Sequence, residues 1–492
     1  MLFNSFSFLV FFPVVIIIYY LLAHRWRKLF LLAASCYFYM AFVPKYILIL
    51  WFVITVDFFL GQAIQKADGK QKKVLLAASL AVNLCTLFFF KYLNFFNENI
   101  SAFADFLHWN YSPEILSIAL PLGLSFHIFQ SLSYIIEVYR GKYPAEKNYF
   151  TYALYVMFFP QLVAGPIERP QNLMPQLKLR HEFNASMVRR GLERMLWGFF
   201  KKLVIADQIA IIVNHLYSDL PTDGPTLILL VVLFSYQLYC DFSGYSDIAI
   251  GSASVLGFTL MENFDRPYAS KSVAEFWRRW HISLSSWLRD YLYYPLAIGW
   301  GKKSKWRLHA SLVVTFILIG LWHGANWTFV VMGGMHGVYL VFGSATKEFR
   351  KKIQNMLGLN RVPALLGALQ VMTVFFLVSV SWVFFRAKNL TQAWHIISNL
   401  GNGLENLFRF EYVRNELFRG LLPGVGNKER LIVIFSSIIA LEIVQLAQER
   451  KKTIFIFDSH PAAIRYGWYY ALIFTMLFFG YFGEQVFIYF QF

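Results

Sequence analysis

The sequence predicts an all-α, polytopic membrane protein, because its composition, its apolar runs and its charge distribution all favour that class. The chain has 492 residues, of which 58% are hydrophobic and 15% are charged, whereas an average soluble domain has about 45–50% apolar and about 25% charged residues. About 20 apolar residues cross a bilayer core as a helix. Many such runs follow one another without a long polar linker, which predicts one membrane domain over residues 1–492.

The net charge of +17 is distributed as expected for a membrane protein. Its basic residues gather in short clusters between apolar runs, which is the positive-inside pattern of cytoplasmic loops beside anionic lipid. We therefore expect membrane lipids as partners and no nucleic acid. The clusters lie at 24–28, 66–73, 301–307, 347–352 and 449–452.

Common soluble-enzyme motifs are absent from the sequence. It holds neither GxxxxGK[ST] nor GxSxG, and neither CxxC nor HExxH, which argues against ATP-driven transport on this chain alone, serine hydrolysis and a zinc site. Cys36, Cys85 and Cys240 lie in or beside apolar runs, as small core residues do. We expect no metal and no bound cofactor.

The amino-terminal third predicts helices that cross the membrane in alternating directions. The run 8–23 has no basic residue before it and "HRWRK" after it, which predicts an uncleaved helix whose N-terminus lies outside the cell. The acidic stretch 97–114 is also expected outside. Further helices are expected at 29–43, 46–65, 74–96 and 115–136.

The middle of the chain predicts broken and amphipathic elements. Residues 149–165 favour a short or re-entrant element that ends in "AGPIERP", with Glu168 and Arg169 at the interface. Residues 176–202 favour a basic, partly amphipathic cytoplasmic region. Spans are expected at 203–218 and 226–258. Residues 271–300 predict an amphipathic helix at the cytoplasmic surface. Its aromatic face holds Trp277, Trp280, His281, Leu284, Leu288 and Tyr291, with Arg278, Arg279 and Arg289 elsewhere.

Residues 311–342 contain no Asp, Glu, Lys or Arg. As one helix they would be about 48 Å long, well beyond one span, so the run must tilt, break or double back. The motif "GLWHGANW", 320–327, lies near its middle. Later spans are expected at 364–385, 431–447 and 466–484, around a loop at 386–430, for a total of about eleven or twelve.

Ionisable groups within these runs are candidates for a working site, because burying them in a bilayer is costly. His323 and His281 each fit either a packing role or a catalytic role, whereas His336, in "GGMHG", favours packing. Asp241 and Asp247, with Tyr245 between them, fit a substrate cavity or a structural polar network. "NFDRPY", 263–268, favours a structural turn over a substrate clamp.

Arg278 and Arg279 fit either lipid headgroups or the phosphates of a substrate. "LPLGLSFHIFQ", 120–130, indicates a further broken helix. The residues alone therefore leave a transporter and a membrane-embedded enzyme open.

Six stretches together resemble the membrane-bound O-acyltransferase (MBOAT) family, and most of all its bacterial alginate O-acetyltransferase branch. The likeness covers almost the whole chain. The stretches, in order, are "LPLGLSFHIFQSLSYIIEVYRG", "FPQLVAGPIERP", "YCDFSGYSDIAIG", "NFDRPY", "FWRRWHISLSSWLRDYLYYPL" and "LWHGANWTFVVMGGMHG".

The resemblance implies a ring of helices around a central tunnel, with His323 as the catalytic histidine and His281 as the second histidine. We hypothesise that His323 is the general base and that His281 orients the donor or shuttles the proton, with Asn326 or backbone N–H groups near Gly324 at the oxyanion. Asn326 fits either that role or completion of the broken backbone. Asp241, Tyr245, Arg278 and Arg279 are the further candidates for substrate binding. No cysteine or serine has a clear claim to be a nucleophile.

The implied reaction moves an acyl group, usually acetyl, across the bacterial inner membrane, toward a periplasmic transferase partner that modifies a polysaccharide. The donor would be acetyl-CoA or an acylated carrier protein at a basic mouth around Arg278, Arg279 and Lys302. The acceptor stays open among alginate, cellulose, peptidoglycan and other polysaccharides. The alternatives are a transporter or flippase for a lipid-linked saccharide with His323 as proton relay, and a scaffold for the periplasmic enzyme.

Overall fold

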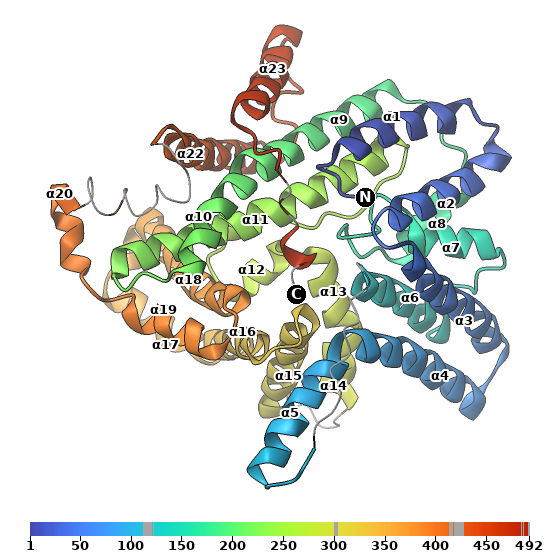
Figure 1. Ribbon diagram of the computed structural model, residues 1–492, viewed down its shortest axis with the longest axis horizontal. Coiled ribbons are helices and arrows are strands. Elements are labelled where there is room, and N and C mark those ends of the chain that lie inside the picture. The colour runs from blue at the N-terminus through green and yellow to red at the C-terminus, as the bar shows by residue number, and fades with distance from the viewer. Residues whose placement is uncertain are drawn as a thin grey trace. The chain divides into compact units, whose positions relative to one another are not determined.

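Helices make up every regular element in the described part of the chain, which confirms the all-α prediction (Figure 1). The computed structural model describes residues 1–111, 121, 123–299, 304–412, 417, 428–483, 485 and 487–490. Lys302, the first residues of the predicted helix 115–136 and part of the predicted loop 386–430 lie outside these ranges.

The chain divides into two compact units, and two of the three boundaries between them fall within helices. The first unit is Met1–Leu192 with Ile248–Glu262, and the second is Glu193–Asp247 with Asn263–Phe492. The single MBOAT-like domain therefore stays a prediction.

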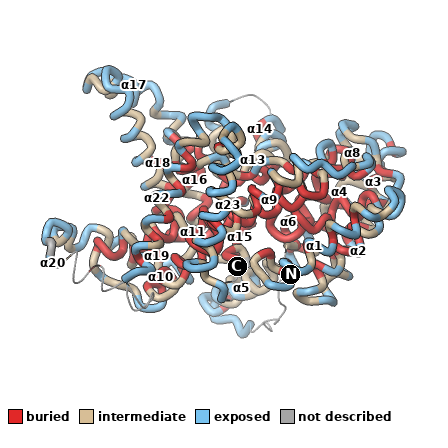
Figure 2. Tube along the Cα trace, turned by 90° about the horizontal axis from the view of Figure 1, so that it is seen from above, coloured by how far each residue is buried: buried red, intermediate tan, exposed pale blue. Residues whose placement is uncertain are grey.

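The first unit contains a helix that is buried along most of its length, α6, which Figure 2 shows as nearly continuous red. Gly123 precedes α6 with φ +72°, and an added Cβ there would lie 2.9 Å from the Leu162 carbonyl oxygen. Glu168, predicted at the interface, is buried. Its carboxylate is satisfied there, because the side chain of Asn172 and the N–H of Met261 both donate hydrogen bonds to it. The helices of this unit are α1 Phe6–Leu21, α2 His24–Met40, α3 Ile47–Lys66, α4 Gly69–Leu87, α5 Leu93–Phe106, α6 Leu124–Tyr139, α7 Tyr149–Met157, α8 Pro170–Lys178 and the start of α9 Ala185–Phe199.

The second unit begins with the end of α9, which continues through a π-helical turn, Phe200–Ala206, into α10. Most of α11 belongs to this unit. Its helices are α10 Asp207–Ser218, α11 Gly224–Val255, α12 Val273–Arg279, α13 Ile282–Leu288, α14 Tyr294–Gly299, α15 Lys305–His323, α16 Trp327–Ala345, α17 Lys347–Met356, α18 Pro363–Arg386, α19 Leu390–Asn399, α20 Phe410–Tyr412, α22 Lys428–Lys451 and α23 Ala462–Phe479.

Eight helices in the described residues are long and apolar enough to cross a membrane, and α1 is a shorter apolar helix. The chain is thus a multi-pass membrane protein. The predicted number of about eleven or twelve included shorter and broken elements and stays a prediction. The eight segments are Pro44–Lys66, Gly69–Phe106, Gly224–Val255, Lys305–His323, Trp327–Ala345, Pro363–Arg386, Lys428–Lys451 and Ala462–Phe479.

The uncharged run 311–342 doubles back, which the structure shows as two helices side by side (Figure 1). Helix α15 ends at His323 and α16 begins at Trp327, with a short turn between them. The two helices approach closely because glycines face the partner backbone: a Cβ on Gly320 would lie 2.0 Å from the Phe329 carbonyl oxygen, and one on Gly333 2.2 Å from that of Phe316. This confirms the predicted break at the motif.

The predicted amphipathic helix 271–300 is wrong as one continuous element. It breaks between α12 and α13 because His281 takes the left-handed conformation, with φ 43°. Its aromatic face is also core rather than surface, since Trp280 and His281 are each 1% exposed. Arg278 and Arg289 remain exposed, as predicted.

Replacing Gly333 with alanine tests whether backbone contact holds the α15–α16 hairpin. Because the new methyl group would overlap the Phe316 carbonyl oxygen, we expect the free energy of unfolding to fall by about 1–3 kcal/mol. Gly334→Ala is the matched control, since its nearest neighbour is a side-chain atom of Ile317 at 4.0 Å. Thermal unfolding in detergent compares the two, and equal melting temperatures would contradict the packing.

Candidate active site

His323 is the last residue of α15, and its side chain is 5% exposed. Aromatic rings from three parts of the second unit surround it. Its ring centroid lies 4.9 Å from that of Trp322, 5.4 Å from that of Tyr489 and 5.5 Å from that of Phe385. The end of a buried helix thus presents the imidazole to an aromatic enclosure.

His281 lies at the break between α12 and α13, where Asn263 binds the two residues that follow it. The Asn263 carbonyl accepts the N–H of Ile282 at 2.9 Å, and the Asn263 side chain accepts the hydroxyl of Ser283 at 2.9 Å. These bonds fix a left-handed conformation that L-residues adopt at a cost of about 1–2 kcal/mol. The "NFDRPY" segment therefore positions His281, and its Asp265–Arg266 ion pair fits the structural interpretation.

The two histidines share aromatic neighbours. The Trp322 ring lies 6.1 Å from His281 and 4.9 Å from His323, measured between centroids. Phe242 of α11 lies 4.7 Å from His281 and 4.5 Å from Tyr489, which contacts His323. The structure thus brings the two predicted histidines near each other, and the ring of Trp322 contacts both.

Burial determines the protonation state of His281. Desolvation lowers its pKa to about 3, because burial disfavours the charged imidazolium. His281 is therefore neutral near pH 7, with one N–H donor and one acceptor nitrogen in its ring. It is suited to hydrogen bonding rather than to taking up a second proton.

Asn326 caps α16. Its side-chain oxygen accepts the N–H of Thr328 at 2.9 Å, and its amide nitrogen donates to the carbonyl of Lys388 at 3.2 Å. A capping asparagine satisfies a backbone donor that the helix leaves unpaired. Of the two roles that the sequence left open, these contacts favour completion of the broken backbone over the oxyanion.

Asp241 belongs to a buried ion network rather than an open cavity. Lys202 lies between two carboxylates, 2.7 Å from Asp241 and 2.8 Å from Asp207. The other carboxylate oxygen of Asp241 accepts the backbone N–H of Ile488 at 2.9 Å. Asp241 therefore tethers the carboxyl-terminal segment 487–490, which carries Tyr489, to α11.

The neighbouring acid, Asp247, is paired as well. Lys201 lies 2.6 Å and Arg194 3.0 Å from its carboxylate, and the ring of Tyr245 stacks on Phe487 at 4.7 Å. Lys201 and Lys202 are buried, whereas the sequence suggested a cytoplasmic surface for this basic stretch. The apolar residues on both sides of the two lysines, 195–200 and 203–206, were the signal in the sequence that could have indicated their burial.

The remaining sequence candidates lie at the edge of the enclosure or outside it. Arg279 pairs with Glu275 at 2.7 Å, and Arg278 is exposed on the same helix. His336 accepts the indole N–H of Trp277 at 3.3 Å, which fits its predicted packing role. Sequence reasoning missed Tyr489, since nothing near it in the chain indicates a contact with His323.

The sequence also matches a known protein family. The model of MBOAT, the membrane-bound O-acyltransferase family, matches residues 33–385. The chain belongs to this family. It is accordingly an O-acyltransferase, as the sequence predicted.

Named relatives cover most of the chain. It is 40% identical over 435 residues to the probable alginate O-acetylase AlgI of Pseudomonas aeruginosa. The aligned residues cover 86% of this chain and 78% of that protein. It is 33% identical over 410 residues to the peptidoglycan O-acetyltransferase of Helicobacter pylori, with 76% and 73% covered. It is also 30% identical over 243 residues to the teichoic acid D-alanyltransferase of Bacillus subtilis, and these residues cover 47% of this chain and 60% of that protein.

His281→Gln is expected to flatten the pH dependence of stability. The pKa of the folded histidine, about 3, is below its unfolded value of about 6.5, so the unfolded chain binds the proton first. Stability is therefore lost as the pH falls below about 6.5, by up to about 1.4 kcal/mol per pH unit.

Thermal unfolding at pH 7 and pH 5 measures this effect. The glutamine variant should lose less stability between these values than the unchanged protein, whereas His108→Gln, at an exposed position, should behave like the unchanged protein. The same loss in all three proteins would contradict a buried neutral His281.

Proposed function

We propose that the protein takes an acetyl group from a cytoplasmic thioester donor and moves it across the inner membrane toward O-acetylation of an extracytoplasmic polysaccharide. The observation that carries the proposal is the pair of buried histidines within one aromatic enclosure. The names of the relatives, an alginate O-acetylase and a peptidoglycan O-acetyltransferase, support an acetyl group and a polysaccharide acceptor.

His323 acts as the general base in this proposal. Its ring nitrogen takes the proton of the attacking hydroxyl as that oxygen bonds to the thioester carbonyl carbon. The carbon–sulfur bond then breaks, and the proton passes to the leaving thiolate. Histidine suits this task because its unperturbed pKa is about 6.5, and positioned proton transfer typically contributes about 10²–10⁴-fold.

His281 is assigned a positioning role. Since burial lowers its pKa to about 3, it orients the donor or the enclosure rather than relaying a proton. With the side chain of Asn326 engaged as a cap, backbone N–H groups of the turn after His323 are the preferred donors for the oxyanion.

Tyr489 provides a phenol ring beside the proposed base. Its ring packs on His323 with centroids 5.4 Å apart, and the Asp241–Ile488 bond holds the segment that carries it. We include in the proposal that this phenol accepts the acyl group before it leaves the protein. The ester forms as the proton moves to His323 and the thiolate leaves.

The donor is proposed to arrive at the basic edge around Arg278 and Arg279, as acetyl-CoA or an acylated carrier protein. A periplasmic transferase is the proposed partner that receives the group. The protein is placed in the bacterial inner membrane, with its N-terminus outside the cytoplasm, as the first apolar run and the basic cluster after it suggest.

His323→Ala should abolish acetylation of the surface polysaccharide, with a loss of about 10²-fold or more. Acetyl content is measured in cells and divided by the amount of protein in the membrane. His336→Ala is the control, because it removes a buried imidazole that packs against Trp277. It should lower thermal stability but keep acetylation per folded molecule.

Two outcomes would contradict the assignment. Full acetylation with His323→Ala at normal protein levels would favour a scaffold for the periplasmic enzyme. Retained saccharide transport with no acetyl transfer in the unchanged protein would favour a transporter.

Tyr489→Phe separates the hydroxyl from the ring. We expect it to abolish acetyl transfer while thermal unfolding stays near that of the unchanged protein, because the ring contacts with His323 and Phe242 remain. Tyr489→Ala should lower both activity and stability. Normal transfer by Tyr489→Phe would rule out the phenol as an acyl acceptor.

A further inference from the structure

A cavity in the first unit is lined mainly by cations and apolar side chains. It holds about 100 Å³, and no acidic residue is among the side chains that line it in the described structure. The lining consists of Tyr19, His24, Arg25, Arg27, Lys28, Leu31, Leu154, Leu177, Lys178, Leu179, His181 and Phe258.

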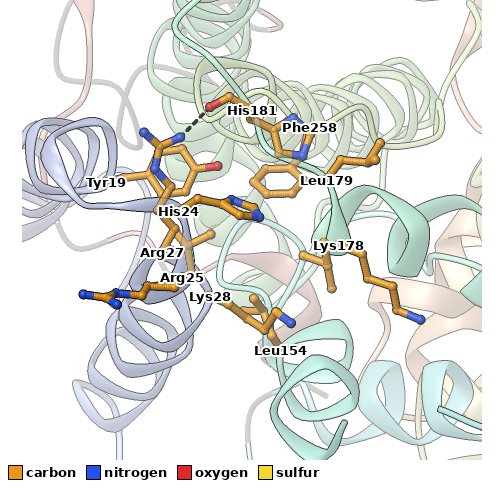
Figure 3. Close-up of a pocket in the computed structure, with 12 residues that line it drawn as sticks. Tyr19, His24, Arg25, Arg27, Lys28, Leu154, Lys178, Leu179, His181 and Phe258 are labelled. Atoms are coloured by element: carbon orange, nitrogen blue, oxygen red, sulfur yellow. Dashed lines mark hydrogen bonds between the residues drawn. The ribbon is translucent and has the colours of Figure 1, made fainter. Parts of the chain in front are cut away.

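The basic side chains of the lining come from two segments that are far apart in the sequence. Four belong to the first turns of α2, and Lys178 and His181 follow from the end of α8. Figure 3 shows His24 and Lys28 pointing toward the side of Lys178 and Leu179, whereas Arg25 points away. Like charges brought together in this way repel each other, so an anion between them would be favoured.

Protein contacts hold this arrangement in place. Arg27 donates to the carbonyls of Leu22, Tyr20 and His181, which ties the start of α2 to the segment after α8. Its donors are therefore engaged by the backbone, and Arg27 serves as a brace rather than as a ligand group.

The two lysines are held less completely. Lys28 donates one hydrogen bond, to the Thr151 hydroxyl at 2.7 Å, and Lys178 pairs with Glu146 at 2.6 Å while about half of its side chain stays exposed. An ammonium has three donors, so Lys28 retains donors toward the cavity, whereas the Lys178 ammonium points away from His24 and Lys28 in Figure 3 and adds positive charge at the rim. Helix α2 begins here without a side-chain cap, and its N-terminal dipole adds to the positive field.

The floor of the cavity is apolar. Leu31, Leu154, Leu177 and Phe258 line it, and the Phe258 ring packs on His181 with centroids 4.4 Å apart. A cationic edge over an apolar floor fits a phosphate that is attached to a less polar group.

We propose that this basic cavity binds a phosphate group, with Lys28 and His24 as its ligands and Lys178 as a further positive charge at its rim. Two sources share that chemistry: the headgroup of an anionic phospholipid, and the phosphates of a nucleotide-bearing coenzyme. The proposal goes beyond acyl transfer, and binding rather than activity tests it, so its failure is distinct from failure of the proposed function.

The full-length protein in detergent provides the test. Binding of phosphatidylglycerol is followed by native mass spectrometry, and binding of coenzyme A by titration calorimetry. The variant Lys28→Gln with Lys178→Gln keeps hydrogen-bonding side chains but removes two charges. Its matched control is Lys351→Gln with Lys352→Gln, which removes two charges from exposed positions on α17.

We expect the cavity variant to bind one of the two probes at least tenfold more weakly, while the control binds as the unchanged protein does. Loss of phosphatidylglycerol alone identifies the lipid as the source, and loss of coenzyme A alone identifies the coenzyme. Equal binding of both probes by both variants would overturn the proposal.

His24→Glu covers the case in which the double variant fails to fold. His24 is exposed, so the substitution should leave the melting temperature unchanged, and its carboxylate should repel the phosphate. A folded His24→Glu protein that binds both probes normally would also overturn the proposal.

Discussion

The second unit depends on charge pairing around Lys202, because an unpaired charge in a membrane protein interior is prohibitively costly. Lys202 is shared by Asp207 and Asp241, and Asp241 also accepts the Ile488 N–H. Removing one partner from a buried pair typically costs about 3–5 kcal/mol. The same pairing that stabilises α10 and α11 therefore places the carboxyl-terminal segment against His323.

The turn after His323 is a second consequence of satisfying polar groups. A helix that ends inside a membrane protein leaves backbone groups that need partners. Asn326 supplies one by capping α16, while Gly320 and Gly333 let the two backbones approach. The helix thus ends at the imidazole, which places a titratable ring beside a turn rather than along a packed helix face.

Local patterns were enough to predict the break in the uncharged run 311–342, because helix length is a property of a short segment, whereas the choice of His323 and His281 rested on the family resemblance. Contacts between distant segments were not predictable in the same way. The left-handed conformation of His281 depends on Asn263, so the amphipathic pattern around it suggested a continuous helix. Lys201 and Lys202 looked like surface residues because Asp247 and Asp241, which pair with them, lie about 40 residues further along, although Asp207, the second partner of Lys202, is close in the chain.

The aromatic enclosure around His323 fits the proposed acyl transfer. A thioester is also open to attack by water, so a site that transfers its acyl group must exclude solvent, and exclusion also strengthens every electrostatic interaction inside. The rings of Trp322, Phe385 and Tyr489 surround His323 and exclude solvent from it, which also strengthens its electrostatic interactions. Because the hydrogen bond between Asp241 and Ile488 holds the segment that carries Tyr489, the ion network that stabilises the helices also supports the aromatic wall around the histidine.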